Sequence, residues 1–171
     1  MKLVSRRLSD LDLAICWTTR NPFDVNDEDS GLFFTSRKEF ERMIAEEKFL
    51  EYVSICGNYY GTPHDCLREA RESDKDLCVK VDDRGVEQIK QKTPEAVSIV
   101  VVPGNSARDI KTLDSTIDPR LLSFLQELSL PSRLQGRDKY DHIIITNNHQ
   151  ESADRVVEIV RSERRRKGGP A

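Results

Sequence analysis

Residues 57–62 read Gly57-Asn58-Tyr59-Tyr60-Gly61-Thr62, and they directly follow the stretch Leu50-Glu51-Tyr52-Val53-Ser54-Ile55-Cys56. The apolar and β-branched residues of the preceding stretch predict a strand. Gly57 and Gly61 predict a sharp turn, because glycine adopts backbone conformations that other residues avoid. This turn would present Tyr60 and Thr62 next to the strand that carries Glu51.

Strands and helices alternate along the rest of the chain. Strands are expected over residues 11–16, 32–35, 50–56, 77–81, 97–102 and 142–146. Helices are expected at 1–8, after the capping box of Ser36 and Glu39, from Pro63, through Val86 and Ile89, and over 119–130 and 152–164. Strands separated by helices of this length predict an α/β fold with a parallel core sheet and helical crossovers.

Composition is that of an ordinary globular domain. The 171 residues suffice for one domain with its own core, and 37% are hydrophobic while 33% are charged. The net charge of −3 gives no general attraction to nucleic acid or to anionic lipid. No long apolar run or secretory leader is present, so we expect a cytoplasmic protein without a membrane segment.

The end of the chain is strongly basic. Arg161 and the run Arg164-Arg165-Arg166-Lys167 precede two glycines. We expect a disordered, solvated tail over residues 165–171, an interpretation that we favour over a contact with nucleic acid or a partner.

The cysteines predict neither a metal site nor a disulfide framework. Cys56, Cys66 and the nearby His64 match no common zinc spacing, and Cys16 and Cys78 lie far from them in the sequence. We expect reduced thiols and no metal ligands.

Five side chains suit a purine mononucleotide. The carboxylate of Glu51 can accept two hydrogen bonds at once, and guanine offers two donors on one edge, which adenine does not offer in that arrangement. Thr62 can add a hydroxyl contact and Asp82 a second carboxylate. Arg20 offers a guanidinium matched to phosphate oxygens, and Tyr60 offers a phenol donor. Each of these residues alone is more often an ordinary surface, cap or turn residue, so the hypothesis depends on their joint order.

That order resembles the guanylate kinase family from Leu3 to about Arg164. The similar motifs are Thr18-Thr19-Arg20-Asn21-Pro22, Ser36-Arg37-Lys38-Glu39-Phe40, Phe49-Leu50-Glu51, Gly57–Thr62, Val79–Gly85 and Tyr140–Asn148. The resemblance implies a three-layer P-loop nucleotide-kinase-like fold in one domain over residues 1–171. It also implies a small mixed-sheet GMP-binding subdomain over 21–62 and a lid-like segment over 104–130. By this resemblance Arg20 and Tyr60 hold the GMP phosphate, and Glu51, Thr62 and Asp82 hold guanine.

Several positions depart from the family's pattern. Phe23 and Leu32 stand where the family has an arginine and a tyrosine on the phosphate, and Asn26 replaces a glutamate. Lys80 replaces the first aspartate of an Asp-x-Asp motif, and Thr112–Thr116 lacks the arginines of the family's lid. These arginines neutralise charge on the transferring phosphoryl group, so their loss predicts impaired catalysis.

The largest departure is at the start. No segment matches Gly-x-x-x-x-Gly-Lys-Ser/Thr, and Met1 falls near the helix that would follow this phosphate-binding loop, so the first core strand and the loop are expected to be missing. ATP and magnesium are therefore expected as cofactors only if an upstream P-loop exists.

Three functions remain open from the sequence. We favour a guanylate-kinase-like protein that binds GMP or a similar guanine nucleotide and has no catalytic residue of its own. An active guanylate kinase with a misassigned start is the first alternative. The second is a domain that binds a phosphorylated peptide in the former GMP site, as the guanylate-kinase-like domains of scaffold proteins do.

Overall fold

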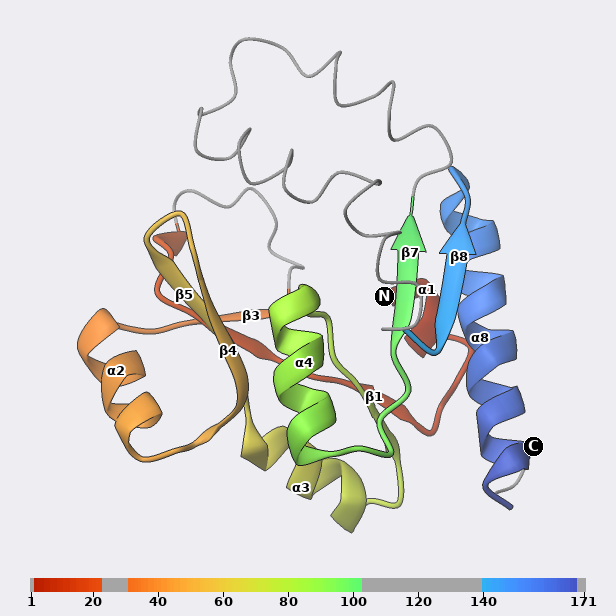
Figure 1. Ribbon diagram of the computed structural model, residues 1–171, viewed down its shortest axis with the longest axis horizontal. Coiled ribbons are helices and arrows are strands. Elements are labelled where there is room, and N and C mark those ends of the chain that lie inside the picture. Colours follow the sequence, from red (N-terminus) through yellow and green to blue (C-terminus); the bar gives the residue numbers. More distant parts are fainter. Residues whose placement is uncertain (1, 23–30, 103–139, 169–171) are drawn as a thin grey trace, which may run out of the picture. The chain divides into compact units, whose positions relative to one another are not determined.

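The computed structural model describes residues 2–22, 31–102 and 140–168. It divides into two compact units, of which one comprises Met1–Arg7 with Val97–Ala171 and the other comprises Leu8–Ala96. Each unit combines helices with strands (Figure 1). The chain therefore belongs to the α/β class, as the alternating pattern predicts.

The Leu8–Ala96 unit is built on a mixed sheet of four strands in the order β3-β2-β5-β4. The strands are β2 (Cys16–Thr18), β3 (Leu32–Phe34), β4 (Phe49–Ile55) and β5 (Asn58–Pro63). β3 runs parallel to β2, whereas β5 runs antiparallel to both β2 and β4. Between β4 and β5, Cys56 and Gly57 both have positive φ, at 49° and 80°, as the two-residue turn of a tight hairpin requires.

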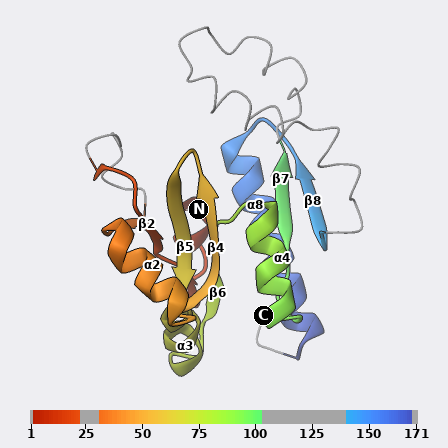
Figure 2. The same ribbon diagram turned by 60° about the vertical axis from the view of Figure 1, so that its left-hand side comes forward.

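One face of this sheet is covered by helix α2 (Arg37–Ala45), as Figure 2 shows. The helix begins where the sequence predicts, because the Ser36 hydroxyl accepts the backbone N–H of Glu39 at 3.1 Å. Phe40 is fully buried and stacks on Phe49 and on Tyr59, with ring centroids 4.3 and 5.2 Å away. Aromatic packing thus fixes the hairpin against α2.

The same unit contains a second, two-stranded parallel sheet of β1 (Leu11–Leu13) and β6 (Asp76–Cys78), with helix α3 (His64–Glu72) preceding β6. Helix α4 (Asp83–Lys92) follows and packs against β4.

Two side chains of α4 bind the backbone of β4. The Gln88 amide accepts the N–H of Tyr52 at 3.1 Å and donates to its carbonyl at 2.8 Å. Lys92 Nζ donates to the carbonyls of Phe49 and Leu50 at 2.8 and 2.9 Å. These bonds satisfy backbone groups of β4 that no described strand pairs with, and they fix the helix beside this strand.

The other unit pairs β7 (Ile99–Val102) with β8 (His142–Ile145) in parallel. It also holds α1 (Lys2–Ser5), which the sequence places in a helix over residues 1–8, and α8 (His149–Arg166). An ion pair between Arg7 and Asp154 ties the segment after α1 to α8. The side chain of Asn148 caps α8 by accepting the N–H groups of Gln150 and Glu151.

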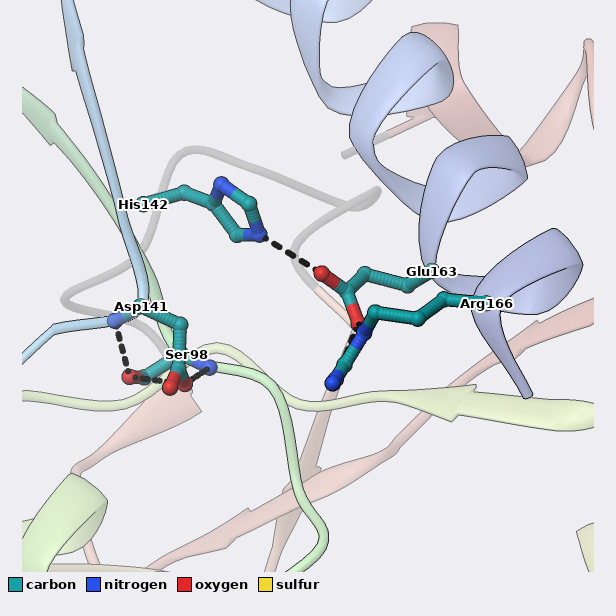
Figure 3. Close-up of polar contacts among 5 residues, drawn as sticks. All are labelled: Ser98, Asp141, His142, Glu163 and Arg166. Carbon is teal, nitrogen blue, oxygen red and sulfur yellow. Dashed lines mark hydrogen bonds and ion pairs between the residues drawn. The ribbon is translucent and has the colours of Figure 1, made fainter.

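Polar contacts connect the residues at the start of the β7–β8 pair to each other and to α8 (Figure 3). Asp141 Oδ2 accepts both the N–H and the hydroxyl of Ser98, at 2.7 and 2.8 Å. His142 Nε2 lies 3.1 Å from Glu163 Oε1 of α8, and Arg166 donates to the other oxygen of Glu163. All of these partners are within the unit, so the cluster has a structural role.

Several expected boundaries differ from the observed ones. The expected strand over 11–16 is not continuous, because Leu11–Leu13 forms β1 and pairs with β6, whereas Cys16 begins β2 and pairs with Leu32 of β3. The mixed sheet already begins at Cys16, whereas a subdomain over 21–62 was expected, because β2 pairs with β5. The tail was expected to be disordered from residue 165, but α8 continues through Arg166, which pairs with Glu163 one turn earlier. The expected helix over 119–130 and the lid over 104–130 lie outside the described residues.

Among the described helices, none has the length and apolar character needed to cross a membrane.

Candidate functional site

The strand register of the mixed sheet gathers four polar residues on the face opposite α2. Thr18 pairs with Tyr60, and Thr62 pairs with Glu51. Directly paired residues project to the same side of a sheet, and residues two apart on a strand do so too. The predicted residues Glu51, Tyr60 and Thr62 therefore share one face, whereas Trp17 and Tyr59 pack against the aromatic cluster under α2.

Glu51 is a buried carboxylate, with 3% of its surface exposed. Burial raises its pKa, and the nearby charge of Asp82 raises it further, whereas hydrogen bonds from the hydroxyl and backbone N–H of Thr62 and the charge of Lys92 act in the opposite direction. An ionised carboxylate has about four positions that accept hydrogen bonds. Thr62 is the hydrogen-bonding neighbour of this carboxylate, so Glu51 retains accepting positions for a ligand.

Threonines before Arg20 tie its backbone to β5. The Thr18 hydroxyl donates to the carbonyl of Tyr59 at 2.9 Å and accepts the N–H of Arg20 at 3.1 Å. The Thr19 hydroxyl accepts the N–H of Tyr59 at 2.9 Å. Arg20 thus begins next to the segment that carries Tyr60, which is half-buried. This placement brings the two predicted phosphate ligands to the same end of β2 and β5.

Asp82 is the N-cap of α4. Its Oδ1 accepts the backbone N–H groups of Arg84 and Gly85, both at 3.0 Å. Its Oδ2 accepts Nε and Nη2 of the Arg84 side chain at 2.9 and 2.6 Å. The structure therefore places Asp82 close to Glu51, with both of its oxygens already bonded.

The two glycines of the motif have different roles. Gly57 has a φ of 80° in the hairpin turn, as predicted. Gly61 was predicted to lie in the turn as well, but it lies inside β5. A Cβ on Gly61 would come within 2.9 Å of both the Glu51 carbonyl oxygen and Tyr52 Cβ. Gly61 is thus required for the close approach of β4 and β5.

Sequence reasoning missed two residues near Glu51. Cys16 lies two residues before Thr18 on β2, and the charge of Glu51 reaches it, although burial is the main reason that its pKa rises to about 11. Gly85 of α4 lies against Glu51, because a Cβ there would be 3.0 Å from Glu51 Oε2. The period-two alternation of β2 could have identified Cys16. Nothing local in the sequence points to the contact of Gly85.

Leu32 also belongs to this face, because it pairs with Cys16 across β2 and β3. An apolar side chain thus stands where the family's phosphate-binding tyrosine was expected. Phe23 and Asn26 of the same loop lie outside the described residues.

The arrangement suits a small ligand with paired N–H donors and an anionic group. Glu51 can take the donors, and Arg20 and Tyr60 can take the anion. No group of three His, Cys, Asp or Glu in the described part of the chain could hold a metal ion. Fold and site together define an α/β protein with a candidate purine-nucleotide site.

Comparisons with known proteins agree with this class. The family profile described as guanylate kinase matches residues 1–163. A guanylate kinase of Fusobacterium nucleatum is 33% identical over 166 residues, which cover 93% of this chain and 86% of the relative. The guanylate kinase of Bacillus subtilis is 28% identical and covers 94% of this chain and 79% of its own length.

A solved structure shows the same fold. The crystal structure of guanylate kinase from Anaplasma phagocytophilum aligns with a TM-score of 0.72 at 23% identity, and the match covers 95% of this chain and 80% of the other. On these findings the chain belongs to the guanylate kinase family.

Proposed function

We propose that the chain binds GMP on the polar face of its mixed sheet. Glu51 accepts N1–H and the N2 amino group of guanine, and Thr62 orients the carboxylate. Arg20 and Tyr60 hold the phosphate. The observation that carries the proposal is the buried Glu51 carboxylate, which has Thr62 as its hydrogen-bonding neighbour and lies on the same sheet face as Tyr60.

The phosphate end of this site is weaker than the base end. Leu32 offers no hydrogen bond where the resemblance implies a tyrosine, and Phe23 replaces an arginine. Hydrogen bonds to a charged group contribute about 1.5–3 kcal/mol each, so two such losses weaken GMP binding by roughly two to four powers of ten. We therefore expect a modest affinity for GMP.

Calorimetric titration tests the proposal. GMP should bind the unchanged protein, and Glu51→Gln should weaken binding at least about tenfold, because an amide places a donor where guanine requires an acceptor. Arg20→Ala should weaken it by a similar factor. Glu41→Gln is the matched control, because it removes the same charge from exposed α2. Equal binding of AMP and GMP would contradict guanine recognition.

We further propose that phosphoryl transfer is impaired in this chain. The segment that, by the resemblance, should supply the lid arginines has Thr112–Thr116 instead. A coupled assay for ADP and GDP production from ATP and GMP should show no turnover above background. Turnover that Glu51→Gln reduces would instead favour the alternative of an active kinase. The named relatives are guanylate kinases, which favours a nucleotide over a phosphorylated peptide as the ligand.

A further inference from the structure

The two carboxylates at the candidate base site differ in what they can still accept. Asp82 receives four hydrogen bonds, two on each oxygen, all of them from Arg84 and Gly85. Four is about the full capacity of a carboxylate. Glu51, in contrast, has only Thr62 as a hydrogen-bonding neighbour among the residues that the structure describes. Glu51 is therefore free to accept hydrogen bonds from a base, whereas Asp82 is not.

Arg84 supplies most of the hydrogen bonds that Asp82 accepts. Its backbone N–H and that of Gly85 fix Oδ1 at the start of α4, and its guanidinium closes Oδ2 with two further bonds. A third nitrogen of the guanidinium, Nη1, lies 3.4 Å from the Ser54 carbonyl on β4. The side chain therefore bridges the first turn of α4 and the strand that carries Glu51.

A neutral ligand donor competes poorly for this position. Hydrogen bonds with one ionised partner are about twice as strong as neutral ones, so the bonds of Arg84 and a bond from a purine to Asp82 would both gain from the carboxylate charge, and the number of bonds decides. An amino group of a purine would have to replace two bonds from the guanidinium with one bond of its own. The Asp82 carboxylate is only 11% exposed, so few other directions of approach remain.

We propose that Arg84 is a specificity-determining residue that withholds Asp82 from the base, so that guanine is recognised by Glu51 as the only carboxylate acceptor. The inference rests on the proposed function and deepens it, because it assigns the N2 amino group of guanine to Glu51. The resemblance to guanylate kinases implies the opposite role for Asp82.

Substitution of Arg84 provides the first test. Arg84→Met keeps the length of the side chain but frees Oδ2 of Asp82. GMP affinity, measured by calorimetry, should rise about tenfold, the size of one hydrogen bond to a charged group. The affinity for inosine monophosphate, which lacks the N2 amino group, should change less than about twofold, because that ligand has no donor for Asp82. A helix cap alone would not separate the two ligands.

Asp82→Asn provides the second test, because asparagine retains an acceptor for the helix cap. As a single substitution, it should change the ratio of GMP affinity to inosine monophosphate affinity by less than about twofold. Combined with Arg84→Met, it should cancel the tenfold gain in GMP affinity. Arg68→Met, which removes an exposed arginine from α3, is the control for net charge. Circular dichroism and thermal melting confirm that each variant is folded.

The possible failures are distinguishable. If GMP binds the unchanged protein and Asp82→Asn lowers the affinity ratio about tenfold, Asp82 already contacts the amino group and this inference is overturned, while the proposed function stands. If Arg84→Met gives no selective gain for GMP, the inference is overturned as well. If GMP binds neither the unchanged protein nor Arg84→Met, both the proposed function and this inference fail.

Discussion

At the scale of single residues, the binding role proposed for Glu51 comes at the expense of stability. Its carboxylate is buried, and its pKa is raised because the charge is removed from water near a second carboxylate. Guanine donors would compensate that charge in the complex. Among the described residues, Thr62 and Lys92 act in this direction.

The first prediction concerns the stability of Glu51→Gln. A carboxyl group whose folded pKa lies above its unfolded value of 4.5 opposes folding when it is ionised. At neutral pH the variant should therefore be more stable than the unchanged protein, by roughly 1 kcal/mol. The difference should shrink as the pH falls through the raised pKa toward 4.5, because the native carboxyl then becomes neutral too. Urea unfolding at several pH values measures this trend.

Glu163 offers a control of opposite sign. The hydrogen bond from Arg166 lowers its pKa below 4.5, with His142 adding to the effect, so its charge stabilises the fold at neutral pH. Glu163→Gln should destabilise the protein at neutral pH, and the difference should disappear as the pH falls below 4.5 through the lowered pKa. A destabilised Glu51→Gln at neutral pH would contradict the assignment of Glu51 as a buried, uncompensated charge.

At the scale of elements, helix α4 organises the surroundings of Glu51, where the base is proposed to bind. Its cap is Asp82, its first turn places Gly85 against Glu51, and its later turns hold the backbone of β4 through Gln88 and Lys92. The position of Glu51 thus depends on a helix that begins more than thirty residues later in the chain.

Gly85→Ala tests this dependence. Alanine favours an ordinary helix over glycine by about 0.5–1 kcal/mol. Here, however, the added Cβ would lie 2.7 Å from Val81 Cβ and 3.0 Å from Glu51 Oε2, so the helix or the carboxylate must move. Overpacking of this kind costs about 1–3 kcal/mol, so the steric effect should exceed the gain in helix propensity. Thermal unfolding should show a net loss of stability, and GMP affinity should fall with it.

Gln91→Ala, at an exposed position of the same helix, is the matched control. It should change stability by less than about 0.5 kcal/mol. A Gly85→Ala protein as stable as the original would show that α4 does not press on Glu51.

The features that the sequence predicts are determined by residues close together in the chain, whereas the features that it misses depend on contacts between distant segments. Apolar and β-branched residues predict β4, Gly57 predicts the turn after it, and Ser36 with Glu39 predicts the start of α2. The strand β5 was not predicted, because residues 58–61 were assigned to the turn. The closure of Asp82 by Arg84 and the contact between Gly85 and Glu51 could not be predicted, because they depend on side-chain geometry and on packing between distant segments. The sequence shows which residue types the site contains. It does not show how many hydrogen bonds each of these side chains can still accept in the folded protein.

At the scale of the whole molecule, the proposed ligand contacts belong to one of the two compact units. Arg20, Glu51, Tyr60 and Thr62 all lie in the Leu8–Ala96 unit. The other unit is held by its own contacts, among them the parallel β7–β8 pair and the ion pair between Arg7 and Asp154. A ligand that binds only the folded form stabilises the elements that it contacts. The response to GMP should therefore be unequal along the chain.

Hydrogen–deuterium exchange with mass spectrometry measures that inequality in the full chain. Saturating GMP should slow exchange in β4, β5 and the first turn of α4, because the ligand restrains local opening around Glu51. Exchange in α8 should change little, since its backbone is protected by its own helix and by contacts within its unit. In Glu51→Gln, the same GMP concentration should protect the hairpin less. Protection confined to α8 and β8, with none in β4 or β5, would place the ligand elsewhere and contradict the proposed site.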